Sequence, residues 1–165
     1  MVTLRPLDDS NREAVIALSV SPEQLNFVAS VADSLTEAEN EPDGRAVQWG
    51  LYDDETPVGF VMISDEVGAP GYIPQYLWRL LIDESHQRKG YGTAALDLIV
   101  EYFRGRPGVE VMWTSAGQGD GSPLPFYERY GFERTGDLVF DNEILLRFPL
   151  STAGASATNP LAGGT

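Results

Sequence analysis

The stretch Leu80-Leu81-Ile82-Asp83-Glu84-Ser85-His86-Gln87-Arg88-Lys89-Gly90-Tyr91-Gly92-Thr93 contains the transition that decides the fold. The run Tyr76–Ile82 is apolar almost throughout, which is typical of a central strand buried on both faces. A polar loop follows, then a basic turn, then residues 92–103, in which apolar residues recur at helical spacing. The sequence therefore predicts a strand, a tight turn and a helix in succession.

The turn at residues 87–92 has the properties of a phosphate site. Its two glycines allow the backbone to approach a ligand closely, and the following helix begins with a partial positive charge. Arg88 and Lys89 add basic side chains to an otherwise acidic chain. Neither the Walker pattern nor the dinucleotide glycine pattern is present. By itself the pattern also fits an ordinary strand-to-helix turn.

The remaining elements follow from periodicity and turn signals. Strands are predicted at residues 3–6, 46–52, 58–63, 109–113, 138–140 and 143–148, and helices at 11–18 and 123–130. A further helix is predicted to open at Ser21-Pro22-Glu23 and to continue through Val28 and Leu35. This order predicts an α/β (α+β) fold, in which helices pack against a mixed sheet.

Length and composition predict one domain, residues 1–150, followed by a tail. Residues 151–165 are rich in Ala, Gly, Ser and Thr, and we expect them to be disordered. The chain has no cysteine, and its only histidine is His86, so a disulfide or a zinc site is excluded and no metal is expected. Without an apolar run or a secretory pattern, a cytoplasmic protein is expected.

Acidic residues dominate the charge of the chain. There are 25 Asp and Glu against 11 Lys and Arg, which gives a formal net charge of −14. Such a chain repels nucleic acid, because binding to nucleic acid depends on Lys and Arg at the phosphates. We therefore expect neither a nucleic-acid nor a membrane partner. The charge could attract cationic ligands or simply maintain solubility.

A second motif, Phe126-Tyr127-Glu128-Arg129-Tyr130-Gly131-Phe132, follows the predicted fifth strand. With Gln87-Arg88-Lys89-Gly90-Tyr91-Gly92 after the fourth strand, it makes residues 3–148 resemble the GNAT superfamily of N-acetyltransferases. The resemblance implies a mixed central sheet of six to seven strands with about four helices. It also implies that the fourth and fifth strands splay apart and that the enzyme transfers acetyl groups from acetyl-CoA.

The resemblance also implies roles for individual residues. The backbone amides of Leu80, Leu81 and Ile82 would meet the pantetheine arm and polarise the thioester. Gln87, Arg88, Lys89, Gly90, Tyr91, Gly92 and Thr93 would hold the pyrophosphate. Tyr127 matches the tyrosine that protonates the departing thiolate; the alternative is a packed aromatic ring. Asp120, a further candidate coenzyme contact, stands where the family often has asparagine.

A finer resemblance is to the bacterial spermine/spermidine acetyltransferases. It rests on residues 20–25, on Trp78-Arg79-Leu80-Leu81-Ile82-Asp83, and on residues 131–136. The implied acceptor is a polyamine, in agreement with the acidic charge. Glu23 and Glu37 are the carboxylates suspected of binding it, although either also fits a solvated surface. Trp78 could stack on a cation or pack in the core.

The base that activates the amine is not apparent. Producing a neutral amine from a lysine-like ammonium at pH 7 costs about 4.6 kcal/mol, so a base or water should assist. Some polyamine acetyltransferases have an acidic residue at the position of Trp78, which cannot act as a base. His86 lies on the coenzyme side. Another amine (an aminoglycoside, an amino acid or a protein N-terminus) remains open as the acceptor, as do a non-catalytic acyl-CoA-binding role and a homodimer.

Overall fold

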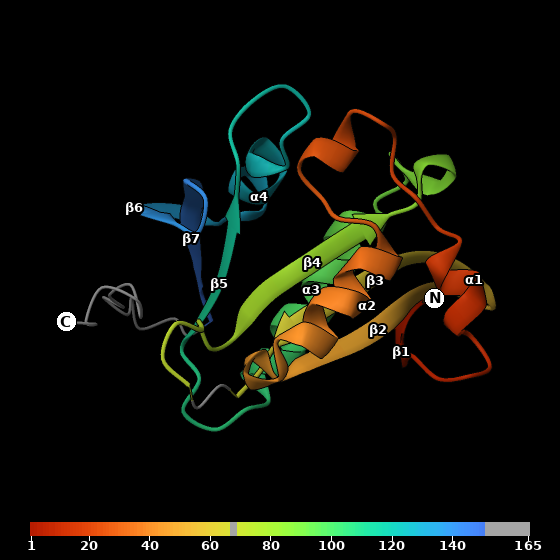
Figure 1. The fold of residues 1–165 in the computed structure, drawn as a ribbon, viewed down its shortest axis with the longest axis horizontal. Helices are drawn as coiled ribbons and strands as arrows, with labels where there is room; N and C mark the ends of the chain where they lie inside the picture. Colours follow the sequence, from red (N-terminus) through yellow and green to blue (C-terminus); the bar gives the residue numbers. More distant parts are fainter. Residues whose placement is uncertain (67–68, 151–165) are drawn as a thin grey trace.

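The computed structural model describes residues 1–66 and 69–150, so the tail predicted to be disordered lies outside the described residues. A seven-stranded sheet has the order β1-β2-β3-β4-β5-β7-β6 (Figure 1). The strands are β1 (Val2–Pro6), β2 (Ala46–Asp53), β3 (Thr56–Ser64), β4 (Tyr76–Ile82), β5 (Val111–Ala116), β6 (Glu133–Val139) and β7 (Glu143–Pro149). The helices are α1 (Arg12–Ile16), α2 (Val31–Asn40), α3 (Tyr91–Arg104) and α4 (Leu124–Tyr130), with 3-10 turns η1 (Gln24–Asn26), η2 (Pro42–Gly44) and η3 (Glu84–His86).

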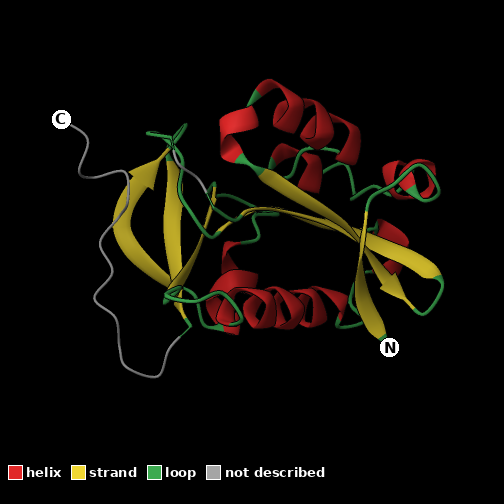
Figure 2. Ribbon diagram, turned by 90° about the horizontal axis from the view of Figure 1, so that it is seen from below, coloured by secondary structure: helices red, strands yellow, loops and turns green. Residues whose placement is uncertain are grey.

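Helices cover both faces of the sheet (Figure 2). Along β3, Phe60 and Met62 pack in the cluster that also contains Val15 of α1 and Leu35 of α2. The alternate residues of β3 pack with α3, in the cluster that contains Phe103. Because successive side chains of a strand point to opposite faces, the unbroken apolar runs of the central strands are explained by burial on both sides. The predicted mixed sheet with helices on it is confirmed.

The sheet opens between β4 and β5, its one parallel pair of neighbouring strands. The only register pair between them joins Tyr76 to Trp113, where the Trp113 amide donates to Gln75 O at 2.9 Å. The Thr114 hydroxyl donates to Leu77 O at 3.0 Å. Beyond this point the two strands diverge, as Figure 1 shows, and the predicted splay is confirmed.

A β-bulge in β4 lies at the point of divergence. Met62 is paired with Arg79 and Ile63 with Leu77, so Trp78 is an extra residue on β4. A bulge shifts the alternation of a strand. As a result Trp78 and Arg79, although successive, both contact Glu37 of α2.

The predicted helix opening at Ser21 is wrong in its extent. Gln24–Asn26 form only a 3-10 turn, and α2 begins at Val31 with Ser30 as its N-cap. Ser30 Oγ accepts a hydrogen bond from the Asp33 amide at 3.1 Å. Leu25, expected on the apolar face, is 49% exposed. The apolar periodicity continues across the break, and both serines are possible helix starts, but in the structure the α-helix begins only after Ser30.

We expect Ser30→Ala to lower the free energy of unfolding by about 1 kcal/mol, because the Asp33 amide loses its acceptor. Ser21→Ala is the matched control, since no hydrogen bond of the Ser21 hydroxyl is found among the described residues. Urea unfolding followed by circular dichroism measures both. Equal losses in the two variants would contradict the observed helix start.

Candidate active site

A cavity of about 490 Å³, here called the α3 cavity, lies where β4, the start of α3 and α4 meet. It is lined by Val20, Gln24, Val28, Leu80, Ile82, His86, Gln87, Arg88, Gly90, Tyr91, Gly92, Thr93, Gly121, Ser122, Pro123, Phe126, Tyr127 and Arg129. Nine of the predicted site residues are among these. Of the predicted coenzyme-binding residues, Leu81, Lys89 and Asp120 are not, although Gly121 and Ser122, which follow Asp120, are.

The turn before α3 exposes backbone amides at the cavity. Arg88 (φ 62°) and Gly90 (φ 83°) both have left-handed backbones, a conformation that glycine adopts without strain. Gly90 is the N-cap of α3 and supplies no side-chain cap, so the amides of the first turn keep their hydrogen-bonding capacity. A Cβ built on Gly90 would have no atom within 4 Å, so the turn faces open space.

The segment around η1 spans the opening of the sheet. On the β4 side, the Gln87 amide group donates to Gln24 Oε1 at 2.7 Å and to Ile82 O at 2.9 Å. On the β5 side, the ring of Phe27 lies 3.3–3.6 Å from Cβ positions built on Gly117, Gly119 and Gly121, so it packs closely against these three glycines. These contacts explain why this segment leaves the helical path predicted for it.

Beyond the bulge, the backbone N–H and C=O groups of β4 point alternately toward β3 and toward the gap between β4 and β5. A Cβ built on Gly59 would lie 2.5 Å from Leu81 O, so the Leu81 carbonyl points toward β3. Backbone groups of successive residues in a strand point in alternate directions. Leu80 and Ile82 therefore face the gap, whereas Leu81, predicted to meet a ligand there, faces β3. The Ile82 carbonyl is already satisfied by Gln87.

Tyr127 lines the α3 cavity but is only 6% exposed. Burial raises the pKa of its phenol to about 12, against the lowering effects of a hydrogen bond with Thr114 and of the Arg79 charge. The phenol is therefore protonated at neutral pH and has a proton that it can donate. Tyr130, three residues on, donates instead to Asp97 of α3 at 2.7 Å.

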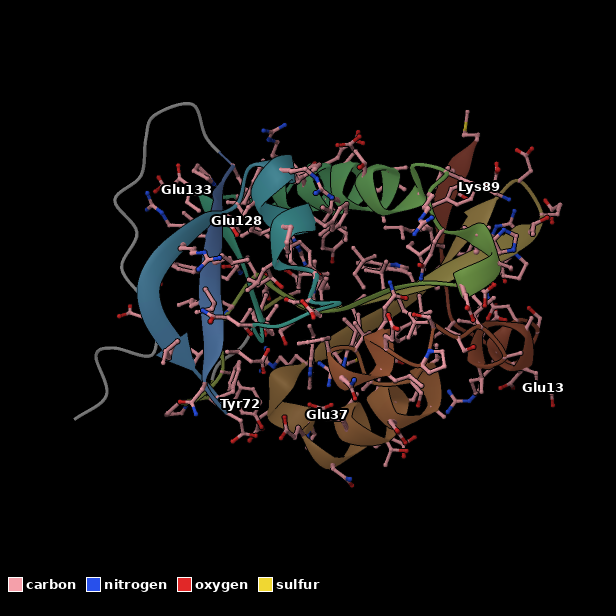
Figure 3. All side chains as sticks on the ribbon, turned by 90° about the horizontal axis from the view of Figure 1, so that it is seen from above. Glu13, Glu37, Tyr72, Lys89, Glu128 and Glu133 are labelled. Carbon is pink, nitrogen blue, oxygen red and sulfur yellow. The ribbon has the colours of Figure 1, made fainter. Side chains whose placement is uncertain are left out.

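A second cavity of about 680 Å³, here called the α2 cavity, lies on the other side of Trp78 and Arg79. It is lined by Glu37, Glu41, Ser64, Pro70, Gly71, Tyr72, Ile73, Tyr76, Trp78, Arg79, Phe140, Asp141 and Glu143. In Figure 3, Glu37 and Tyr72 lie across the molecule from Lys89, on the side away from the α3 turn. The molecule thus has one cavity at the basic turn and another beside α2.

Glu37 and Trp78, predicted as separate substrate contacts, contact each other. The Trp78 indole donates to Glu37 Oε1 at 3.1 Å, and the other oxygen of Glu37 pairs with Arg79. Glu23, the other predicted carboxylate, is exposed and lines neither cavity. His86 lies in the α3 cavity, and its ring centroid is 6.3 Å from that of Tyr91.

Three polar residues of the α2 cavity region were missed from the sequence. The hydroxyls of Tyr76 and Ser115 are 2.5 Å apart, and Ser115 Oγ is 3.1 Å from Glu143 Oε1. These residues are 39 and 28 positions apart along the chain. No local spacing could have indicated them, because strand pairing alone brings them together. Within residues 1–66 and 69–150, no cluster of three or more His, Cys, Asp or Glu could hold a metal ion.

Comparisons with known proteins agree with this geometry. The model of the acetyltransferase (GNAT) family matches residues 22–132. A spermine/spermidine N(1)-acetyltransferase of Bacillus subtilis strain 168 is 29% identical over 147 residues, covering 86% of this chain and 94% of that protein. This chain belongs to the GNAT acetyltransferase family, and is therefore an acyltransferase that uses acetyl-CoA.

Solved structures support the fold. The ribosomal-protein-S18-alanine N-acetyltransferase of Escherichia coli aligns with a TM-score of 0.63 at 20% identity, covering 96% of this chain and 100% of that one. The spermidine N-acetyltransferase of Vibrio cholerae, in complex with CoA and spermine, aligns with a TM-score of 0.62 at 17% identity, covering 88% and 92%. At these identities the likeness concerns the fold.

The raised pKa of Tyr127 makes a prediction about stability at high pH. Between pH 10 and pH 12 the folded protein keeps a proton on this phenol that the unfolded chain, with a pKa near 10, has lost. Its contribution is complete below pH 10 and falls as the pH rises toward 12, by about 2–3 kcal/mol. We expect the unfolding free energy of Tyr127→Phe to fall less steeply than that of the wild type over this range. Identical pH slopes in urea unfolding would contradict the buried phenol.

Proposed function

We propose that the chain transfers the acetyl group of acetyl-CoA directly to a primary amine of a polyamine such as spermine or spermidine. The observation that carries the acceptor assignment is the charge of the α2 cavity. Four carboxylates line it, Glu37, Glu41, Asp141 and Glu143, against one guanidinium, that of Arg79. A cavity with this excess of negative charge favours a ligand with several cationic centres.

Aromatic rings in the same cavity suit the rest of such a ligand. Tyr72, Tyr76, Trp78 and Phe140 line it together with the carboxylates. Aromatic faces attract ammonium groups and also cover apolar methylene chains, the two components of a polyamine. The pKa of Tyr72 is raised by partial burial and then by the negative charges of Glu41 and Asp43, which indicates a negative potential at that end.

The α3 cavity suits coenzyme A. The uncapped first turn of α3 presents amides and a positive dipole end, and the basic side chain of Arg88 stands beside it. In this proposal these groups hold the pyrophosphate, with Lys89 contributing charge from the exposed side of the turn. Leu80 and Ile82 offer backbone groups to the pantetheine arm, and an amide at the thioester oxygen would stabilise the developing negative charge.

Tyr127 is proposed to donate its proton toward the departing sulfur. It lines the α3 cavity at the end of the sheet gap, and its pKa keeps the phenol protonated at neutral pH. A thiol has a reference pKa of about 8.5, so the phenol stabilises a thiolate first by hydrogen bonding and needs help to complete the transfer. The charge of Arg79 and the contact with Thr114 lower the pKa of Tyr127 and so act in that direction.

Other expectations stay predictions. A homodimer, the lack of a nucleic-acid partner and a cytoplasmic location rest on the sequence, as do the coenzyme contact of Asp120 and the substrate contact of Glu23. Among the described residues no helix is long and apolar enough to cross a membrane. The family also contains acetyltransferases of other amines, so the acceptor is best decided by a panel.

A thiol-release assay with acetyl-CoA tests the acceptor. We expect turnover with spermine and spermidine, with a kcat/KM that falls as salt rises from about 0.05 to 0.5 M, because the cavity charge is then screened. Diamines, aminoglycosides, amino acids and short peptides complete the panel. Preferred turnover of one of these would overturn the polyamine assignment, and coenzyme binding without any turnover would indicate a binding module.

Tyr127→Phe tests the proposed acid. We expect kcat to fall about 10²- to 10³-fold, in the range of a lost acid catalyst, while acetyl-CoA binds with unchanged affinity. Tyr130→Phe is the matched control, because this phenol bonds to Asp97 on the surface and lies outside both cavities. Isothermal titration calorimetry measures binding. A Tyr127→Phe enzyme with wild-type kcat would exclude the acid role.

A further inference from the structure

A hydrogen-bonded chain joins three strands beside the opening of the sheet. It runs from Tyr76 on β4 through Ser115 on β5 to Glu143 on β7, with oxygen–oxygen distances of 2.5 and 3.1 Å. Ser115 has a single hydroxyl proton, which it donates to the Glu143 carboxylate. Tyr76 must then donate to Ser115 Oγ. The hydroxyl groups of this hydrogen-bonded chain therefore all donate in the same direction, from Tyr76 to the Glu143 carboxylate.

The hydrogen-bonded chain and Tyr127 lie on opposite faces of the sheet. Tyr76 and Leu145 pack together with Trp113 in one cluster, and by strand alternation Ser115 and Glu143 share the face of Trp113 and Leu145. Tyr127 packs with Met112 in the cluster on the opposite face. A thioester held in the gap between β4 and β5 would thus have a phenol on one side and a carboxylate on the other.

Glu143 differs from the other carboxylates of the α2 cavity. Glu37 has both oxygens engaged by Trp78 and Arg79. Glu41 is exposed at the C-cap of α2, and Asp141 is exposed in the turn between β6 and β7. Glu143 is partly buried, and among the described residues no donor contacts its Oε2. It therefore combines a fixed side chain with a free oxygen that can accept a proton.

The ionisable groups around Glu143 support this assignment. They are Tyr76 and Arg79 from β4, Tyr127 from α4, Asp141 from the adjacent turn, and Glu37 and Glu41 from α2. Burial raises the pKa of Tyr76, and the charge of Glu143 raises it further, so Tyr76 keeps its proton and cannot serve as the base.

We propose that Glu143 is the general base that takes the proton of the acceptor ammonium, and that Ser115 and Tyr76 hold its carboxylate in place. This assignment rests on the proposed acetyl transfer to an amine, although not on which amine. Glu143 would supply the base that some polyamine acetyltransferases have on β4, at the position where this chain has Trp78. At pH 7 only about 1 in 2,500 molecules of a lysine-like amine is neutral. A base that deprotonates the bound ammonium can therefore increase the rate greatly.

The groups named above account for every proton that moves in the reaction. Glu143 Oε2 removes one proton from the ammonium, and the freed nitrogen pair forms the C–N bond at the thioester carbonyl. Tyr127 gives its proton to sulfur as the C–S bond breaks, and the second nitrogen proton returns through water to restore the phenol. Glu143 then releases its proton to solvent. One amide, one thiol and one proton result from one ammonium and one thioester.

Glu143→Gln is the central variant, because glutamine can still accept from Ser115 but cannot take a proton. With whichever amine the wild type acetylates best, we expect kcat/KM to fall about 10²- to 10³-fold at pH 7, with acetyl-CoA affinity unchanged. The wild-type profile should reach a plateau below the pKa of the amine. The variant should instead rise about tenfold per pH unit, because only the neutral amine then reacts.

Two further variants separate a base from a structural role. In Glu143→Ala, added formate should restore part of the activity, since a small carboxylate can occupy the vacated space. Glu101→Gln makes the same change of charge on the exposed face of α3, outside both cavities, and should behave as the wild type. Thermal unfolding of each variant checks that it is folded.

The outcomes are distinct. A Glu143→Gln enzyme with a kcat/KM within about threefold of the wild type would overturn the assignment of Glu143 as the base. Lower activity with an unchanged pH profile, together with no formate rescue of Glu143→Ala, would also overturn it. Either result would leave the proposed acetyl transfer intact. A wild type that releases no thiol with any amine would overturn both. Turnover of a different amine would overturn only the polyamine acceptor.

Discussion

The rest of the site depends on the incomplete pairing of β4 with β5. A buried strand in the middle of a sheet needs hydrogen-bonding partners for its backbone along both edges, because buried groups without one are costly. After the Tyr76–Trp113 pair, no strand of the described residues pairs with the gap edge of β4, and Gln87 satisfies only the Ile82 carbonyl. An extended ligand with amide groups can complete this edge. The fold therefore defines a ligand site before any catalytic residue is considered.

The two cavities at this gap differ in the charge of the residues that line them. The α3 cavity has a helix N-terminus and the Arg88 side chain, which favour the anionic coenzyme. The α2 cavity has four carboxylates, which favour a cationic acceptor. Trp78 and Arg79 stand between them, held on Glu37 by the bulge in β4. In the proposed reaction, the opposite electrostatic preferences on the two sides of one gap would bring an amine and the thioester together.

Around η1 the predicted helix and the observed structure differ. Ser21 with Pro22 and Ser30 with Asp33 are both plausible helix starts, and the apolar spacing runs through both. The choice is made by contacts with distant segments: Phe27 with the glycines after β5, and Gln24 with Gln87. Such contacts override local propensity, which is weak in comparison. For the same reason Glu23, which the sequence places at a helix start and suggests as a contact of the acceptor, lies outside both cavities.

The sequence by itself determined the order of elements, the basic glycine-containing turn before α3 and the motif that contains Tyr127, because each depends on neighbours within a few residues. The tertiary structure alone decided which backbone groups of β4 face the gap, since one extra residue in a strand reverses the alternation beyond it. It also decided the pairing of Glu37 with Arg79 and the chain from Tyr76 to Glu143. These residues meet because separate strands and a helix pack together, and no spacing within one segment encodes that meeting.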